Sequence, residues 1–380
     1  MKDEYPTGKA DLMTAFMVRA QQMSTRGGTW AMINLPSWMS LKSFESLRHD
    51  LLRDQWIVSM VHLGRGVFGS DFGTVAFVVN NVLPGAARGV YRRLFEQHVD
   101  VRSVAAIESL FRDGTYNRYE VAQVDFAAIP GSPIVYWLSE KMLAAFGLGS
   151  PLGEVAEPRQ GLATADNNRF LRQWWEVSSN RTGLSCGSRA QALEAGQRWF
   201  PYNKGGDFRR WYGNQEFVVN WENDGVEIRA FGVEEGGRPR SRAQNTGMYF
   251  SPSVSWSKIS SGAPAFRAYP AGFIFDVAGT SMFAETHHDR DALIAFTNSQ
   301  VAYEQLVAVA PTMNFEVGQV AGLPVVSGMS DEVTDRVAVL VEQSKTDWDS
   351  FESSWNFTIN PLIETFRNTS SARPKQADSN

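Results

Sequence analysis

The spacing of apolar residues in the first part of the chain alternates between two periods. Residues 9–22 and 41–52 carry apolar side chains at the three-and-four spacing of a helix that buries one face. Short apolar runs rich in valine, phenylalanine and methionine predict strands at residues 30–35, 57–63, 74–79 and 88–95. This order predicts an α/β domain that resembles the second half of a doubly wound sheet, with residues 30–35 as a buried strand and a helix at 133–146 leading out of it.

The pattern changes beyond about residue 153, where short apolar runs are broken by glycine, proline, asparagine and serine. Turn sequences such as Asn223-Asp-Gly225 and Gly236-Gly237 separate the runs, so residues 151–328 predict a mainly β (α+β) domain. Helical spacing returns within residues 329–366, which we interpret as a helical linker. The tail, residues 367–380, is polar and rich in serine, and we expect it to be disordered.

The composition is that of a chain able to bury a substantial core, with 43% hydrophobic, 12% aromatic and 20% charged residues. No stretch approaches the roughly 18 uninterrupted apolar residues of a membrane helix, and the first residues lack the apolar core of a secretion signal. We therefore expect a cytoplasmic protein without a membrane partner. The single cysteine, Cys186, can form no internal disulfide, and the pair His287-His288 is typical of a solvated helix start, so we predict no metal site.

The net charge of −5 hides an uneven distribution. Between Arg159 and Arg267 there are 15 lysines and arginines against 10 aspartates and glutamates, so the excess of negative charge lies in the rest of the chain. The location of charge matters more for nucleic-acid binding than the total, which makes this middle segment the candidate DNA face. The alternative stays open that these cations only solvate the surface while the aromatic residues form core.

The tract RWFPYNKGGDFRRWY, from Arg198 to Tyr212, mixes aromatic and cationic residues around a pair of glycines. Guanidinium groups bind phosphate oxygens and stack on flat rings, and aromatic faces accept unstacked bases, so the mixture suits a nucleic-acid surface. We expect most of the cations to contact phosphate, and Asn203 or Asn214 to be able to read adenine. The candidate DNA-binding residues are Arg169, Arg172, Asn203, Lys204, Arg209, Arg210, Asn214, Arg240, Arg242 and Lys258.

Several blocks, in order along the chain, carry a specific family resemblance. They are YPTGKADLMTAF from Tyr5, GGTWAMINLPSWM from Gly27, LGRGVFGSDFGTVAFVV from Leu63, ATADNNRFLRQWW from Ala163, and the tract from Arg198 to Tyr212. Together they resemble the adenine-specific DNA methyltransferases of BREX phage-defence systems, the PglX family, over residues 5–362. The resemblance implies that residues 1–150 are the distal half of a Rossmann-like class I methyltransferase domain and that 151–328 form a DNA target-recognition domain. It also implies double-stranded DNA as a partner and S-adenosylmethionine as the methyl donor of the complete enzyme.

The loop from Gly64 to Gly73 has the character of a site that stacks on the target base. Methylation of the exocyclic amine of adenine requires the base to leave the duplex and to be held by a stacking pocket. Phe68, by its position ahead of the predicted strand at 74–79, matches the base-stacking aromatic residue of the family, and Phe72 is the second choice. The alternative is that both rings only pack against the edge of the sheet.

Two segments expected of a complete enzyme do not occur in these 380 residues: the Gly-rich loop for S-adenosylmethionine and the Asn-Pro-Pro-Tyr segment that grips the target amine. We therefore expect a piece of a longer enzyme that is inactive alone, binds no cofactor by itself, and pairs with the missing N-terminal half or with other defence proteins. The alternative is a freestanding DNA-binding recognition subunit without catalysis. A carbohydrate-binding β module would leave the α/β half and the excess of cations unexplained.

Overall fold

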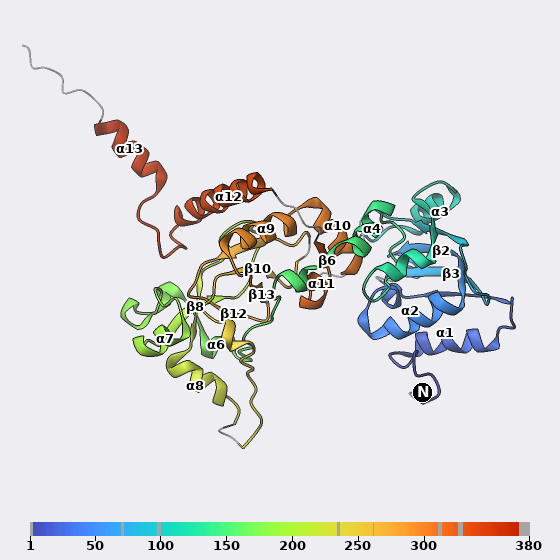
Figure 1. Cartoon of the computed structure of the whole chain (residues 1–380), viewed down its shortest axis with the longest axis horizontal. Coiled ribbons are helices and arrows are strands. Elements are labelled where there is room, and N and C mark those ends of the chain that lie inside the picture. The colour runs from blue at the N-terminus through green and yellow to red at the C-terminus, as the bar shows by residue number, and fades with distance from the viewer. Residues whose placement is uncertain are drawn as a thin grey trace, which may run out of the picture. The chain divides into compact units, whose positions relative to one another are not determined.

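The structure is a computed structural model of the chain, shown in Figure 1. It describes residues 3–69, 72–96, 100–233, 236–260, 262–310, 314–325 and 330–371. The chain divides into two compact units, Met1–Ser150 with Val307–Pro311, and Pro151–Leu306 with Thr312–Asn380. Both units mix helices with sheets, so a mixed α/β chain with several sheets is observed. Among the described residues, no helix combines the length and the apolar character needed to cross a membrane.

The first unit places a five-stranded sheet among short helices. Its elements are α1 (Leu12–Met23), β1 (Thr29–Asn34), η1 (Pro36–Met39), η2 (Lys42–Phe44), α2 (Glu45–Asp54), β2 (Trp56–Gly64), η3 (Val67–Gly69), β3 (Thr74–Asn80), β4 (Arg88–Arg93), α3 (Val104–Arg112), β5 (Arg118–Ala122), η4 (Gln123–Ala128) and α4 (Glu140–Leu148). The sheet has the order β1-β3-β2-β4-β5. The helix predicted at 133–146 is observed as α4. It begins only at Glu140, where the Ser139 side chain caps it.

The strand directions in this sheet differ from those of a parallel, doubly wound sheet. β3 runs antiparallel to both β1 and β2, β4 runs antiparallel to β5, and β2 and β4 are the parallel pair among the described strands of this sheet. The connection between β2 and β3 is too short for the crossover that parallel neighbours need, so these two strands form a hairpin. β1 lies at the edge of the sheet with half of its side chains exposed, so the prediction of a buried strand there is wrong.

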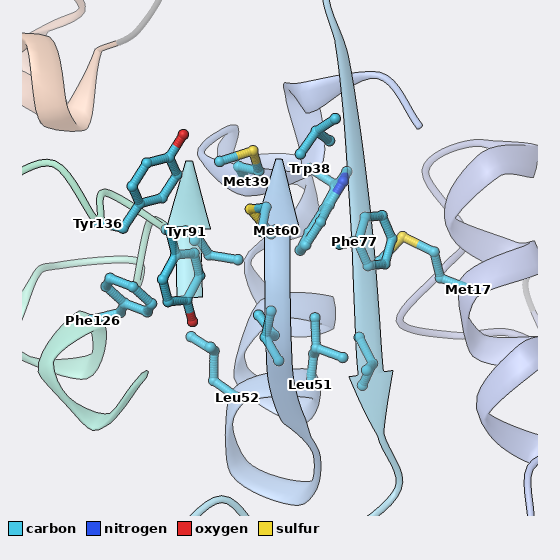
Figure 2. Close-up of a cluster of buried hydrophobic side chains, with 14 of the residues drawn as sticks. Met17, Trp38, Met39, Leu51, Leu52, Met60, Phe77, Tyr91, Phe126 and Tyr136 are labelled. Carbon is cyan, nitrogen blue, oxygen red and sulfur yellow. The ribbon is translucent and has the colours of Figure 1, made fainter. Parts of the chain in front are cut away.

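The core of the first unit lies on the face of the sheet that α1 and α2 cover. Figure 2 shows Met17 of α1 beside Phe77 of β3, with Trp38 on the other side of that ring. Tyr91 and Tyr136 stack with their ring centroids 5.1 Å apart. Each buried apolar side chain of this kind contributes about 1.5–3 kcal/mol of transfer free energy, so this cluster fixes the helices on the sheet.

The second unit contains a four-stranded sheet, a three-stranded sheet, the short strands β6 and β14, and many of the helices. Its elements are β6 (Ser150–Pro151), α5 (Leu152–Val155), α6 (Asn167–Phe170), β7 (Leu171–Gln173), η5 (Trp174–Glu176), η6 (Ser179–Arg181), α7 (Arg189–Ala195), β8 (Trp199–Asn203), β9 (Phe217–Asn220), α8 (Glu222–Ala230), η7 (Thr246–Met248), β10 (Ser253–Ser257), β11 (Phe266–Tyr269), β12 (Ile274–Phe275), β13 (Gly279–Met282), α9 (His287–Thr297), α10 (Gln300–Val309), α11 (Val317–Ala321), β14 (Pro324–Val325), α12 (Asp331–Asp349) and α13 (Pro361–Ser371). One sheet has the order β12-β8-β9-β7 and the other β11-β10-β13.

The segment predicted as a helical linker, residues 329–366, does contain helix, but α12 packs within the second unit. α12 lies against α9, and Thr334, Val337 and Trp348 are buried there. α12 is therefore part of the compact unit and not a free spacer. The first residues of the predicted tail form the end of α13, and residues 372–380 lie outside the described residues.

Candidate nucleic-acid interface

The tract from Arg198 to Tyr212 is divided between the core and the surface. β8 is an inner strand of its sheet, and its side chains Phe200 and Tyr202 are buried. The chain then turns at Gly205 and Gly206, where φ is +79° and +133° and where a side chain on Gly205 would meet the carbonyl of Ala278 at 2.9 Å. Beyond this turn Phe208 is 60% exposed. The aromatic residues before the glycines therefore build the core, and the surface part of the tract starts after them.

The two asparagines proposed to read adenine are buried and their side chains are engaged within the protein. The Asn203 amide donates to the Ser255 hydroxyl at 2.6 Å and to the Gly279 carbonyl at 3.0 Å. The Asn214 amide donates to the Asp207 carbonyl at 2.9 Å, and its own backbone has a φ of +58°. Neither side chain is available to a base in this structure, which corrects their place among the candidate DNA contacts.

Among the described residues, Arg169, Lys258 and Lys204 each lie within ion-pair distance of a carboxylate. Arg169 lies 3.1 Å from Glu227, Lys258 lies 2.9 Å from Glu316, and Lys204 lies 2.6 Å from Asp276. The charge of a paired cation is partly neutralised by its carboxylate, so the pair attracts a phosphate less strongly. These residues are weaker candidates for phosphate contacts than their sequence context indicates.

Two further arginines are held by backbone carbonyls or rings. The Arg172 guanidinium donates to the carbonyls of Asn168 at 2.6 Å and Leu171 at 2.5 Å, and it lies over Trp199. Arg209 stacks on Trp348 of α12, with 4.9 Å between its Cζ and the ring centroid. Both contacts fix the arginines against the protein surface.

Arg210, Arg240 and Arg242 are exposed cations of the predicted set, as is Arg169, which pairs with Glu227. Arg210 lies over the exposed ring of Phe208, at 5.5 Å, and Arg240 lies over Phe231 at 5.7 Å. The backbone of Arg242 pairs with that of Ala163 through two hydrogen bonds of 2.9 Å. Arg240 and Arg242 follow α8 (Figure 1) in the chain, and the pairing with Ala163 fixes the backbone at Arg242. Positive charge is therefore presented by the turn after β8 and by the loop after α8.

A small polar pocket lies next to the pairing of Arg242 with Ala163. Its volume is about 260 Å³ and it is lined by Ala163, Thr164, Ala165, Asn167, Lys204, Asp276 and Val277. The Asp276 carboxylate is buried and accepts hydrogen bonds from the Tyr202 hydroxyl at 2.7 Å and from the Ala278 backbone N–H at 2.6 Å, besides the contact with Lys204. Sequence reasoning missed Asp276. The signal was present, because a charged residue directly after the apolar run Phe273-Ile-Phe275 indicates a buried, paired carboxylate.

The base-stacking candidates lie in and after the short helix η3. Phe72 is 66% exposed, whereas the side chain of Phe68 lies outside the described residues. Gly64, Gly66 and Gly69 all have positive φ, so this loop does use the conformational freedom of its glycines. Stacking of Phe68 or Phe72 on a base remains a proposal.

The described residues hold no group of three or more metal-ligating side chains. Cys186 is buried, and burial raises the pKa of its thiol, so it is a poor nucleophile at neutral pH.

Two pockets of the first unit do not suit S-adenosylmethionine. One is lined by aliphatic residues and Phe111, with Glu108 as its charged member, and the other has a volume of about 10 Å³. We assign no cofactor-binding residue.

No protein-family model matches the chain. The chain is 38% identical over 366 residues to the adenine-specific methyltransferase PglX of Lacticaseibacillus casei (strain Zhang), an alignment that covers 94% of this chain and 30% of the relative. It is 34% identical over 371 residues to the adenine-specific methyltransferase BrxX of Escherichia coli O9:H4 (strain HS), covering 96% of this chain and 29% of the relative. The chain thus spans about three-tenths of the length of these relatives.

The fold is similar to that of a solved restriction-modification enzyme. The Type IIL enzyme MmeI, determined in complex with DNA, aligns with 97% of this chain and 49% of its own, with 10% identity and a TM-score of 0.52. At this identity the likeness concerns the fold alone. The sequence relationship is much closer, and it confirms the resemblance predicted from the sequence blocks: the chain belongs, over nearly all of its own length, to the family of the adenine-specific methyltransferases PglX and BrxX.

Proposed function

We propose that this chain is part of a site-specific adenine DNA methyltransferase of a BREX-type phage-defence system. In this proposal residues 1–150 are the distal half of a Rossmann-like class I catalytic domain and residues 151–328 are the DNA target-recognition domain. The homology to PglX and BrxX supports the proposal, as does the fold similarity to an enzyme solved with DNA. S-adenosylmethionine is the methyl donor of the complete enzyme in this proposal, and Phe68 or Phe72 stacks on the extruded adenine.

The proposed DNA binding is supported mainly by three exposed arginines of the second unit, Arg210, Arg240 and Arg242. We call them the exposed arginine group. Guanidinium groups bind phosphate oxygens in a bidentate manner, and two of these three lie against aromatic rings that limit their motion. An arginine held in place loses less side-chain entropy when it binds phosphate. Its contribution to DNA affinity is correspondingly larger.

The test is replacement of Arg210, Arg240 and Arg242 together by alanine. Each phosphate contact releases condensed counterions, so the loss of three contacts lowers the slope of log affinity against log salt by up to about three units. We expect weaker binding to every duplex sequence, measured by fluorescence anisotropy at several salt concentrations. The control replaces three exposed cations of the first unit, Arg19, Arg26 and Lys42, by alanine. Equal losses in the two variants would show that the arginine group is not the DNA surface.

Catalysis by the chain alone is not expected. The Gly-rich loop and the Asn-Pro-Pro-Tyr segment that the family resemblance requires do not occur in its 380 residues. Methyl transfer is proposed only for an assembly that supplies those segments, either in one longer polypeptide or from a second chain.

A further inference from the structure

The polar pocket beside Ala163 contains a lysine that is held at a fixed position. Lys204 Nζ lies 2.6 Å from the Oδ2 atom of Asp276, and its side chain is 27% exposed. The carboxylate cannot move away, because it is 1% exposed and its two oxygens accept from the Tyr202 hydroxyl and the Ala278 backbone N–H. Tyr202 itself is fully buried. The buried, hydrogen-bonded carboxylate of Asp276 therefore fixes the position of the Lys204 ammonium group.

The electrostatics of this pocket favour a neutral ligand over a phosphate. Lys204 and Asp276 have opposite formal charges in direct contact, so the pair presents almost no net charge to the pocket. A phosphate placed there would be repelled by the carboxylate nearly as strongly as it is attracted by the ammonium group. The ammonium group nevertheless has three N–H bonds, of which one is directed at Asp276, so donor capacity remains.

Beyond the proposed function, on which this inference rests, we propose that Lys204 is a specificity-determining residue that reads the N7 and O6 edge of one guanine in the recognised DNA. Guanine presents two neighbouring acceptors in the major groove, and lysine or arginine donation to them is the commonest specific contact. The two remaining N–H bonds of Lys204 match these two acceptors. Asp276 and Tyr202 are positioning residues, because they hold Lys204 without contacting the base.

The position of the pocket fits this role. Its rim includes Ala163, whose backbone pairs with Arg242 of the exposed arginine group. A duplex bound by its phosphates at Arg242 would bring its base edges close to Lys204. The pocket, with a volume of about 260 Å³, lies below the size of pockets that enclose drug-sized ligands, as expected for a site that takes part of one nucleotide.

The experiment uses a chemical change in the DNA. A duplex enriched by the wild-type chain from a random pool is resynthesised with 7-deazaguanine, which lacks the N7 acceptor, at each guanine in turn. At one guanine the wild-type chain should lose about fivefold or more in affinity, the lower end of the range for a specific base contact. The double variant Lys204→Met/Asp276→Asn leaves no unpaired buried charge. This double variant should bind the guanine duplex and the duplex with 7-deazaguanine at that position with equal affinity. Its slope of log affinity against log salt should equal that of the wild type.

The control variant is Lys345→Met, which removes a lysine from another ion pair of the second unit that is not among the candidate DNA contacts. It should keep the wild-type response to 7-deazaguanine. The inference is overturned if no guanine responds in the wild type, if the double variant responds as the wild type does, or if the double variant lowers the salt slope by about one unit at every sequence, as the loss of a phosphate contact would. If the wild-type chain binds no duplex at all, the proposed function itself fails.

Discussion

At the scale of single residues, a buried arginine determines how the first unit is held together. Arg48 of α2 is 1% exposed and donates to the carbonyls of Gly131, Trp38 and Leu41, at 2.7–3.0 Å. Burial lowers the pKa of this guanidinium to about 10, although Glu45 acts in the opposite direction. Arg48 thus connects α2 to the segments on either side of it, and it is unsuited to any role on the surface.

Replacing Arg48 by methionine should therefore destabilise the first unit strongly. The change leaves three buried carbonyls without their donor, and each unsatisfied buried acceptor costs about 1–3 kcal/mol. We expect the free energy of unfolding of this unit to fall by about 3 kcal/mol or more, measured by urea denaturation. Arg53→Met, on the exposed side of the same helix, should change it by about 0.5 kcal/mol at most. Equal effects of the two changes would contradict this account of Arg48.

At the scale of elements, the edge strand β1 is the exposed feature of the first sheet. Ile33 is 53% exposed on β1, and Leu35 follows it at the surface. An apolar edge strand offers unpaired backbone groups and a hydrophobic face to other chains, which favours association. Ile33→Lys should reduce aggregation, measured by light scattering on warming, while the free energy of unfolding changes by about 0.5 kcal/mol at most. Unchanged aggregation would show that β1 does not drive association.

The elements also show how much the sequence could predict. The helix at α1 and the strands β2 and β3 follow the predicted ranges within a few residues, because periodic burial on one face leaves a strong pattern. The helix start at 133 was wrong, since Ile134, Val135 and Tyr136 are buried by contacts from distant segments and not by a helical face. A similar reason explains why the first part of the Arg198 to Tyr212 tract lies in the core, while its role at a DNA surface stays a prediction. β8 lies between β12 and β9 and all of its side chains are buried, a long-range arrangement that no local pattern reveals.

The same limit applies to the site. Sequence composition identified a cation-rich segment, but it could not show which cations are paired. Glu227, Glu316 and Asp276 come from positions 58 to 72 residues away from their lysine or arginine partners. The exposed positions of Arg210, Arg240 and Arg242 likewise follow from the fold and not from the composition.

At the scale of the whole molecule, we propose that the second unit recognises DNA, although the chain as a whole carries a net charge of −5. The first unit contributes the glycine loop with Phe68 and Phe72, which acts in this proposal on an extruded base and not on the duplex backbone. We therefore expect the duplex to lie on the turn after β8 and on the loop after α8.

Photo-cross-linking tests that location most directly. A duplex that carries 5-iodouracil at successive positions is irradiated with the full chain, and the cross-linked peptides are identified by mass spectrometry. The exposed ring of Phe208 and its neighbours should react, so the account predicts cross-links between residues 204 and 242. Cross-links confined to the helices α2 and α3 of the first unit, or none in the second unit, would contradict it.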